Sequence, residues 1–392
     1  MAESRDARDR PLPLVQFERR EGIIDLGWGH PDPALLPVNE LRAAVARVLD
    51  RYGADALNYG YAAGPGPFRE WVAARLAAVD ERAPGPEAVV ASAGNSQALD
   101  QIATLFAAPG DAVLVENPTY HLAVRILRDH PVELVPVPLD EDGLRVDALA
   151  ETLERLRVAG RRARLLYTIP TFHNPTGVCL TTARRRELVA CAASFGLTIV
   201  EDDAYRELAY EGPPPPSLWS MAPDGLVVRL VSFSKSLAPG LRTGAIVADA
   251  ATARRLVASG VLDSGGGISH FASLVVAELG VSGAYAANVE RLRAAYRLRR
   301  DALLARLGAD LGTAATWAVP RGGYFVWLRL TDGPTARALL ASAESHGTSF
   351  APGDLFHVDG GDPTCLRLAF SRYAPDVLVE AAARLAKAIL SG

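Results

Sequence analysis

The chain has 392 residues, more than the roughly 250–300 residues at which a single hydrophobic core stops growing, so we expect more than one domain. Apolar residues make up 49% of it and charged residues 22%, a balance typical of a globular enzyme. The net charge of −4 offers no electrostatic basis for binding nucleic acid or an anionic membrane surface.

The sequence carries no signal for export or membrane insertion. No apolar run approaches the roughly 20 residues of a transmembrane helix, and residues 1–10 are charged and lack the apolar core of a secretory signal. Cys179, Cys191 and Cys365 are too scattered for a disulfide framework or a zinc site. We therefore expect a protein of the reducing cytoplasm, with no membrane partner.

The N-terminal region predicts an arm followed by two helices. Residues 1–20 are charged and contain proline, which is typical of a flexible arm. The apolar spacing of residues 41–49 and 68–79 predicts helices. Residues 58–67 between them are rich in glycine and proline and predict a loop.

Short apolar segments alternate with helical ones through the middle of the chain. We expect strands at residues 89–91, 112–115, 165–169, 197–200 and 227–232. Continuous apolar strands separated by helices are typical of a parallel sheet covered on both faces. Polar side chains that follow these strands should then gather at one edge of the sheet, where such proteins bind ligands.

The C-terminal part predicts a smaller α+β unit. Residues 284–307 form a long arginine-rich helical stretch, and residues 323–330 and 366–370 alternate like strands. We expect a small domain built from both ends of the chain and a large domain between them, divided as residues 21–45, 46–283 and 284–392.

The chain contains two lysines, Lys235 and Lys387, against thirty-nine arginines. A lysine amine can lose its proton and form a Schiff base with an aldehyde, whereas a guanidinium stays protonated and cannot. Around Lys235, Ser232, Ser234 and Arg242 form a stretch that could hold a phosphate. An isolated Ser-Lys pair would indicate a surface loop, but this combination points to pyridoxal 5'-phosphate (PLP).

Two segments that follow predicted strands carry further polar groups. Gly94-Asn95-Ser96 opens a helix whose free amides and dipole can hold a phosphate, although a plain helix cap would look the same. Asn174, in Asn174-Pro175-Thr176-Gly177, places an amide at the end of a strand, although a β-turn would also explain it.

Three acidic residues, Glu201, Asp202 and Asp203, directly follow an apolar strand. Asp202 could hold a pyridine nitrogen protonated, which makes the ring an electron sink, and Tyr205 could donate to the ring hydroxyl. A metal site is the alternative, but no histidine or further carboxylate cluster completes one, so we expect no metal. Arg367, on an alternating strand, suits a bidentate grip on a substrate carboxylate, with a surface strand arginine as the alternative.

Together these segments resemble the PLP-dependent fold type I enzymes of the class I/II aminotransferase family, in particular its α-aminoadipate/kynurenine aminotransferase-like branch. The resemblance runs from about Gly22 to the C-terminus. It implies an α/β fold in which helices sandwich a mostly parallel seven-stranded sheet in a large domain, next to a small α+β domain. It also implies a homodimer with shared active sites.

The resemblance assigns a role to each motif residue. Lys235 would form the internal aldimine and shuttle the proton, Asp202 would pair with the pyridine nitrogen, and Asn174 and Tyr205 would contact the ring hydroxyl. Tyr120 would stack on the ring, and Tyr59 would reach the phosphate of the neighbouring subunit. The phosphate ligands would be Asn95, Ser96, Ser232, Ser234 and Arg242. The substrate would contact Gly29, Asn174 and Arg367.

The activity implied is that of an aminotransferase, which moves an amino group between an L-amino acid and a 2-oxo acid by ping-pong chemistry. The sequence differs from the family pattern in three ways: His173 replaces a glutamine, Asn95-Ser96 replaces Ser-Gln, and Trp28 and His30 flank the substrate glycine. The histidines are either packing replacements or proton donors and acceptors near the substrate.

The second possibility for the histidines keeps a different activity open. It would suit a secondary-metabolism enzyme of the same fold that catalyses β/γ-elimination, replacement, cyclisation or C–C bond formation, for example on S-adenosylmethionine or a guanidino amino acid.

The same domain also occurs in PLP-dependent transcription regulators. Only some twenty residues precede its first motif here, so we expect no DNA-binding domain and no nucleic-acid partner. The motifs do not specify the donor, the acceptor or the assembly beyond a dimer.

Overall fold

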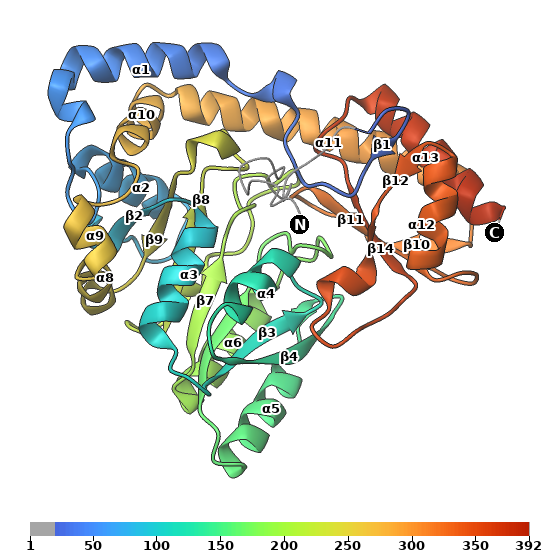
Figure 1. Cartoon of the computed structure of the whole chain (residues 1–392), viewed down its shortest axis with the longest axis horizontal. Helices are drawn as coiled ribbons and strands as arrows, with labels where there is room; N and C mark the ends of the chain where they lie inside the picture. The colour runs from blue at the N-terminus through green and yellow to red at the C-terminus, as the bar shows by residue number, and fades with distance from the viewer. Residues whose placement is uncertain (1–19, 392) are drawn as a thin grey trace, which may run out of the picture.

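The computed structural model of the protein describes residues 20–391, which form a large and a small domain (Figure 1). The arm expected at residues 1–20 lies outside this range except for Arg20. That residue forms ion pairs with Asp25 at 2.7 Å and Glu344 at 2.6 Å, and so joins the start of the described chain to the small domain.

Within the described residues, the sheet of the large domain has eight strands in the order β2-β9-β8-β7-β6-β3-β4-β5. Their bounds are β2 (Val89–Ser92), β3 (Ala112–Asn117), β4 (Glu133–Asp140), β5 (Gly143–Leu144), β6 (Ala163–Thr168), β7 (Thr198–Asp202), β8 (Val227–Ser232) and β9 (Gly244–Val247). Five neighbouring strands of the sheet, β8, β7, β6, β3 and β4, are parallel to one another. Strand β9 is antiparallel to both β2 and β8. The prediction of a mostly parallel sheet is therefore confirmed. The strand beyond the expected seven is β5, a two-residue return on β4 with no apolar run to mark it.

Helices cover both faces of this sheet, because alternate residues of its strands enter different cores. On β3, Leu114 packs in one cluster of buried side chains, while Val113 and Val115 pack in another. The helices of the large domain are α2 (Gly66–Ala77), α3 (Asn95–Phe106), α4 (His121–Arg128), α5 (Val146–Val158), α6 (Thr182–Phe195), α7 (Leu218–Met221), α8 (Ala250–Val257), α9 (Gly260–Gly265) and α10 (His270–Val281). Helices α3, α4 and α8 lie on the Val113 side, and α2, α5, α6 and α10 lie on the Leu114 side.

The small domain is built around an antiparallel sheet in the order β10-β11-β14-β13. A parallel pair, β1 with β12, attaches the N-terminal segment to it. The bounds are β1 (Ile24–Asp25), β10 (Ala315–Trp317), β11 (Phe325–Leu330), β12 (Thr348–Ser349), β13 (Ala351–Pro352), β14 (Cys365–Ala369), α12 (Ala336–Ser345) and α13 (Pro375–Leu390). Both ends of the chain therefore contribute to this domain.

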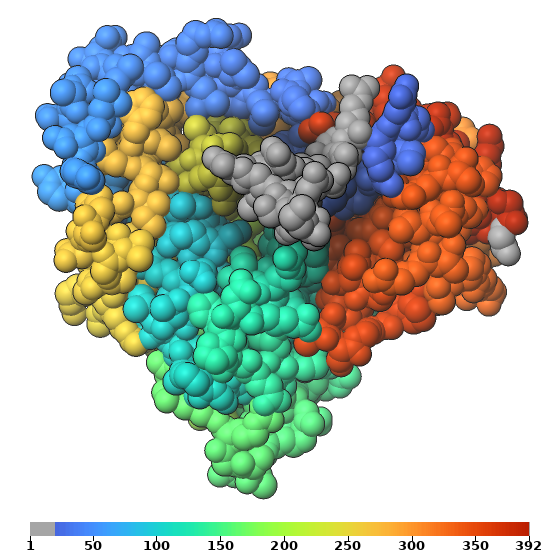
Figure 2. Space-filling model, in the orientation of Figure 1, coloured from blue at the N-terminus to red at the C-terminus, as the bar shows by residue number. Residues whose placement is uncertain are grey.

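Two long helices lie along one side of the molecule, and one of them, α11 (Ala284–Leu311), connects the domains (Figure 1). Helix α1 (Val38–Tyr52) packs on α10, and its blue surface lies beside the yellow segments in Figure 2. Helix α11 enters both cores, with Val289 in the large domain and Leu303 in the small one. A boundary between residues 45 and 46 would cut α1, so we propose a boundary before Val38 instead.

In the described part of the chain, no single helix is long and apolar enough to cross a membrane. Helices α10 and α11 are long and apolar enough only when taken together, and they meet at an angle of 80°.

Candidate active site

Lys235 lies in the loop that follows β8, at the carboxyl edge of the large sheet. Its amine donates a hydrogen bond to the backbone oxygen of Gly29 at 2.9 Å. Burial, together with the charges of Arg367 and Arg242, lowers the pKa of Lys235 from 10.5 to about 8, while Asp202 acts in the opposite direction. An amine with this pKa has a substantial neutral fraction near physiological pH and can serve as nucleophile and base.

Asp202 ends β7 and is held by two side-chain donors. Its Oδ2 accepts the hydroxyl of Tyr167 at 2.7 Å, and its Oδ1 accepts the amide nitrogen of Asn95 at 2.6 Å. Burial raises the pKa of Asp202, and these two hydrogen bonds oppose that shift. Sequence reasoning did not anticipate Tyr167, and it assigned Asn95 to the phosphate. The Asn95 side chain instead contacts the carboxylate.

The other two acidic residues of this segment have separate partners. Glu201 accepts the backbone N–H groups of Leu218 and Trp219 at 2.9 and 3.0 Å. Asp203 forms an ion pair with Arg229 at 2.6 Å. The three carboxylates therefore do not converge. Between residues 20 and 391 no group of three or more His, Cys, Asp or Glu side chains could hold a metal ion.

Donors suited to a phosphate meet at the start of α3. Gly94 caps this helix with φ +85°, and a Cβ there would lie 2.8 Å from Nη2 of Arg242. The same guanidinium donates to the oxygen of Ala93 at 3.1 Å and to the hydroxyl of Ser234 at 3.4 Å. The Ser232 hydroxyl accepts the Ser234 N–H at 3.2 Å and so shapes this loop. A guanidinium, a hydroxyl and free helix amides fit a phosphate-bearing cofactor. Ser96, the second residue of α3, is exposed beside them.

Arg367 lies in the middle of β14 and is 4% exposed. Its guanidinium donates to the Asn174 side-chain oxygen at 2.8 Å and to the backbone oxygen of Gly27. It is also stacked between the rings of Phe325 and Phe356, at 4.2 and 4.6 Å. Its buried Nε has no hydrogen-bond partner among the described residues. The structure thus brings Asn174 and Arg367, both expected to contact the substrate, into direct contact with each other.

Of the two tyrosines expected around the cofactor ring, Tyr205 is buried and Tyr120 is partly buried. Tyr205 packs edge-on against Tyr324 and Phe325, and burial raises its pKa far above 10. Tyr120, which precedes α4, has its pKa raised to about 12, chiefly by burial. Both phenols therefore keep their protons at physiological pH and can donate hydrogen bonds.

The segment from Gly27 to His30 passes beside Lys235 and Arg367. A Cβ on Gly29 would lie 2.5 Å from Cζ of Phe325, so this position has no room for a side chain. The rings of Trp28 and His30 are 5.9 Å apart. Burial and the neighbouring positive charges lower the pKa of His30 to about 4, so its ring is neutral at pH 7.

His173 is enclosed by protein groups. It is 2% exposed, its Nε2 lies 3.1 Å from Oε2 of Glu116, and its Nδ1 lies 2.8 Å from the Thr176 hydroxyl. Glu116 also accepts the hydroxyl of Thr168 at 2.6 Å and the N–H of Ile169 at 2.8 Å. These contacts tie the turn after β6 to the end of β3, which favours the packing interpretation of His173.

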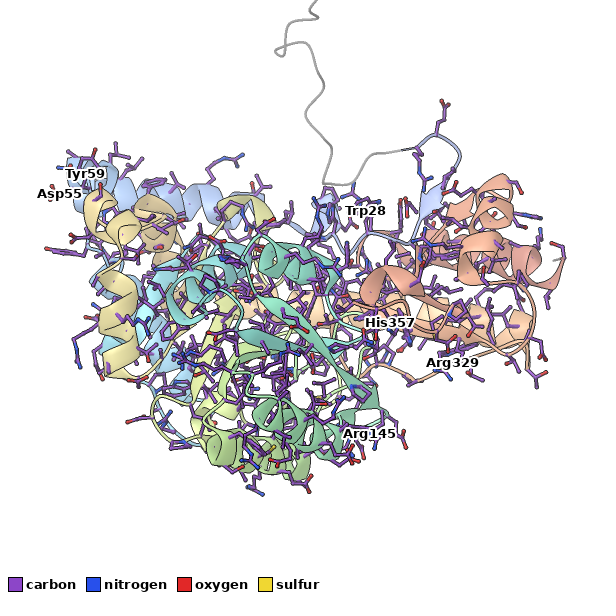
Figure 3. The ribbon with its side chains drawn as sticks, turned by 60° about the horizontal axis from the view of Figure 1, so that its bottom comes forward. Trp28, Asp55, Tyr59, Arg145, Arg329 and His357 are labelled. Atoms are coloured by element: carbon purple, nitrogen blue, oxygen red, sulfur yellow. The ribbon has the colours of Figure 1, made fainter. Side chains whose placement is uncertain are left out.

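Tyr59 is far from the site in its own subunit. Its side chain is 83% exposed, and Figure 3 shows it at the opposite end of the large domain from Trp28.

Tyr324 is a second residue, after Tyr167, that sequence reasoning missed. Its hydroxyl donates to the backbone oxygen of Lys235 at 3.0 Å and holds the lysine loop in place.

With this geometry established, comparison with known proteins defines the class. Residues 21–385 match the family model for aminotransferase class I and II, so the chain belongs to that family. It is 34% identical to aromatic-amino-acid aminotransferase 1 of Thermococcus litoralis, over 96% of this chain and 90% of that protein. Within the family it falls in the branch of aminoadipate- and kynurenine-type enzymes.

Two solved structures of this branch contain the cofactor. Kynurenine aminotransferase from Pyrococcus horikoshii, in complex with PMP, is 32% identical, with a TM-score of 0.88 over 94% of this chain and 91% of the other. Alpha-aminoadipate aminotransferase from Thermus thermophilus, in complex with N-(5'-phosphopyridoxyl)-L-leucine, is 34% identical, with a TM-score of 0.85 over 95% and 93%. The chain is accordingly a PLP-dependent aminotransferase, which acts on an amino acid and a 2-oxo acid.

Proposed function

We propose that the enzyme transfers the amino group of an L-amino acid with an aromatic or large apolar side chain to a 2-oxo acid. One observation carries the proposal: the segment from Gly27 to His30 contacts both Lys235 and Arg367. A substrate beside this segment would present its amino group to the lysine and its α-carboxylate to the unused donor of Arg367. The aromatic rings around that arginine would then lie next to the substrate side chain.

The residues of the site divide the proton chemistry between them. PLP, when bound, supplies an electrophilic carbon and an electron-withdrawing ring. Lys235 would take the proton from the substrate α-carbon and return it, because its lowered pKa leaves part of the amine neutral. Asp202 would hold a proton on the ring nitrogen, and the phenol of Tyr205 and the amide of Asn174 would bind the ring hydroxyl.

The preference for an aromatic or apolar side chain is argued from the lining of the site. Phe325 and Phe356 stack on Arg367, and Trp327 lies edge-on to Phe356 at 5.8 Å. Trp28 and the neutral ring of His30 flank Gly29, whose backbone oxygen contacts Lys235. Aromatic rings bind one another in offset or edge-on contact. The names of two similar enzymes, for aromatic amino acids and for kynurenine, support the same class of substrate.

We also propose that the enzyme is a cytoplasmic homodimer with shared sites. Leu57, Tyr59 and Tyr61 are 70%, 83% and 76% exposed on a loop that packs against Gly266 and His270. Apolar and aromatic side chains exposed together are typical of an interface. Through it, Tyr59 would reach the phosphate in the partner subunit. The three free cysteines agree with a reducing compartment.

The test is a half-reaction with PLP-loaded enzyme, single amino acids and no 2-oxo acid. We expect phenylalanine, tyrosine or kynurenine to convert PLP stoichiometrically to pyridoxamine phosphate, with release of the matching 2-oxo acid. Conversion by aspartate or glutamate alone would overturn the substrate class. Turnover of S-adenosylmethionine that leaves PLP unchanged would instead indicate elimination or cyclisation.

A further inference from the structure

The side chain of Asn95 is the least expected part of the site. Asn95 is the first residue of α3 and lies 107 positions from Asp202 in the sequence, yet its amide nitrogen is 2.6 Å from the carboxylate. The same nitrogen is 3.4 Å from the backbone oxygen of Leu230, on β8. Both amide hydrogens are therefore directed into the sheet edge, toward β7 and β8.

The amide oxygen of Asn95 shows that this orientation is specific. It is buried and has no hydrogen-bond partner in the part of the chain that the structure describes. An unpaired buried acceptor is unfavourable, whereas a hydrogen bond to a carboxylate is roughly twice as strong as one between neutral groups. The contact with Asp202 therefore determines how the amide is turned.

The donors on Asp202 are all neutral: two side chains and the backbone N–H of Ala204. Tyr167 binds one oxygen and Asn95 the other, and no arginine or lysine within residues 20–391 forms an ion pair with this carboxylate. Neutral donors favour the ionised form of a buried carboxylate and fix its orientation. They add no positive charge, which would repel a protonated ring nitrogen. A carboxylate has about four lone-pair sites, so three donors leave one for that nitrogen.

We propose that Asn95 is a positioning residue for Asp202 and acts on the cofactor ring nitrogen through it, rather than binding the phosphate with its side chain. The phosphate is then left to the backbone amides at the start of α3, the Ser234 hydroxyl and Arg242. This inference rests on the role proposed for Asp202 as the partner of the ring nitrogen.

The test compares three ligands of the apo-enzyme by their dissociation constants: PLP, pyridoxal without the phosphate, and 1-deaza-PLP without the ring nitrogen. Asn95→Ala is expected to weaken PLP and pyridoxal by the same factor, about five- to tenfold, and to leave 1-deaza-PLP within about twofold. Ser234→Ala is the matched control with the opposite pattern. It should weaken PLP and 1-deaza-PLP and leave pyridoxal unchanged.

Each alternative has a distinct result. If Asn95→Ala weakens PLP and 1-deaza-PLP but not pyridoxal, Asn95 is a phosphate ligand and the inference is wrong. If Asn95→Ala changes the dissociation constant of none of the three ligands, the inference is also wrong. If the unaltered enzyme binds 1-deaza-PLP as tightly as PLP, the role of Asp202 itself fails. If Asn95→Ala does not fold, Asn95→Ser replaces it in the test. The shorter serine side chain loses the hydrogen bond from the amide to Asp202 and is expected to give the same pattern.

Discussion

The amine of Lys235 and the backbone oxygen of Gly29 are 2.9 Å apart and join the loop after β8 to the N-terminal segment of the small domain. Two residues earlier, the backbone oxygen of Gly27 accepts a hydrogen bond from Arg367. The segment between these contacts therefore sets the separation of the proposed base and the proposed carboxylate clamp. A change of its backbone should affect both groups together.

Substitution of Gly29 by alanine tests this relationship. The new Cβ would lie 2.5 Å from Cζ of Phe325, so either that ring or the segment must move. We expect Gly29→Ala to raise the KM for the amino acid by more than about tenfold, because misplaced binding groups lose most of a charged hydrogen bond. Steady-state kinetics measure the effect. Gly240→Ala, where no atom lies within 4 Å of the new Cβ, is the control. Equal KM values for both variants would contradict the prediction.

The clamp itself is tested at Arg367. Arg367→Ala should raise the KM for amino acids by more than about tenfold, because a hydrogen bond between charged groups is worth more than about 1.4 kcal/mol. Arg329→Ala is the matched control, since Arg329 is on the adjacent strand β11 with its side chain 62% exposed, and Figure 3 shows it toward the outside of the small domain. An unaltered KM in Arg367→Ala would place the carboxylate site elsewhere.

The lowered pKa of Lys235 predicts a dependence of stability on pH in the apo-enzyme. The folded amine has a pKa of about 8, against 10.5 for a lysine in water, so between these values the unfolded chain binds more protons and stability rises with pH. Below pH 8 the amine is protonated in both the folded and the unfolded chain, and its burial lowers the free energy of unfolding by about 3 kcal/mol.

Replacing this amine should remove that cost. We expect Lys235→Met to be more stable than the unaltered apo-enzyme at pH 7 by about 3 kcal/mol, with the difference shrinking from about pH 8 to about pH 10.5. Urea unfolding at several pH values measures it. Lys387→Met, at an exposed position, is the control and should show no such trend. A difference that does not vary with pH would contradict the assignment.

Five of the eight strands of the large sheet could be predicted from the sequence, because apolar runs and the residues that follow them are local features; β4, β5 and β9 were not predicted. Asn174 and Asp202 do lie at the carboxyl ends of β6 and β7, and Lys235 follows β8. The expected separation into two domains also follows from local patterns. What could not be predicted is which of these side chains contact each other.

The contact between Tyr167 and Asp202 shows why. It depends on β6 lying next to β7 in a register that pairs Tyr167 with Val200. Val200 and Asp202 point to the same face, since they are two residues apart on one strand. Strand order and register are long-range properties, so a tyrosine within an apolar run indicated only a buried position. The contacts of Asn95 with Asp202 and of His173 with Glu116 were not anticipated for the same reason, because these partners are distant in the sequence.

The contacts of His173 lead to the last prediction. His173→Ala removes one of the partners of Glu116 and a partner of the Thr176 hydroxyl in a buried site, which should cost about 1–3 kcal/mol of unfolding free energy. His173→Gln places an amide donor and acceptor at the same position and should retain kcat within about threefold, because no proton transfer is assigned to this residue. Urea unfolding and steady-state kinetics measure the two effects, with His346→Ala, at an exposed position, as the control. A loss of kcat of more than about a hundredfold in a stable His173→Gln enzyme would mean that the imidazole exchanges protons with the substrate. The elimination or cyclisation chemistry considered for this fold would then regain its support.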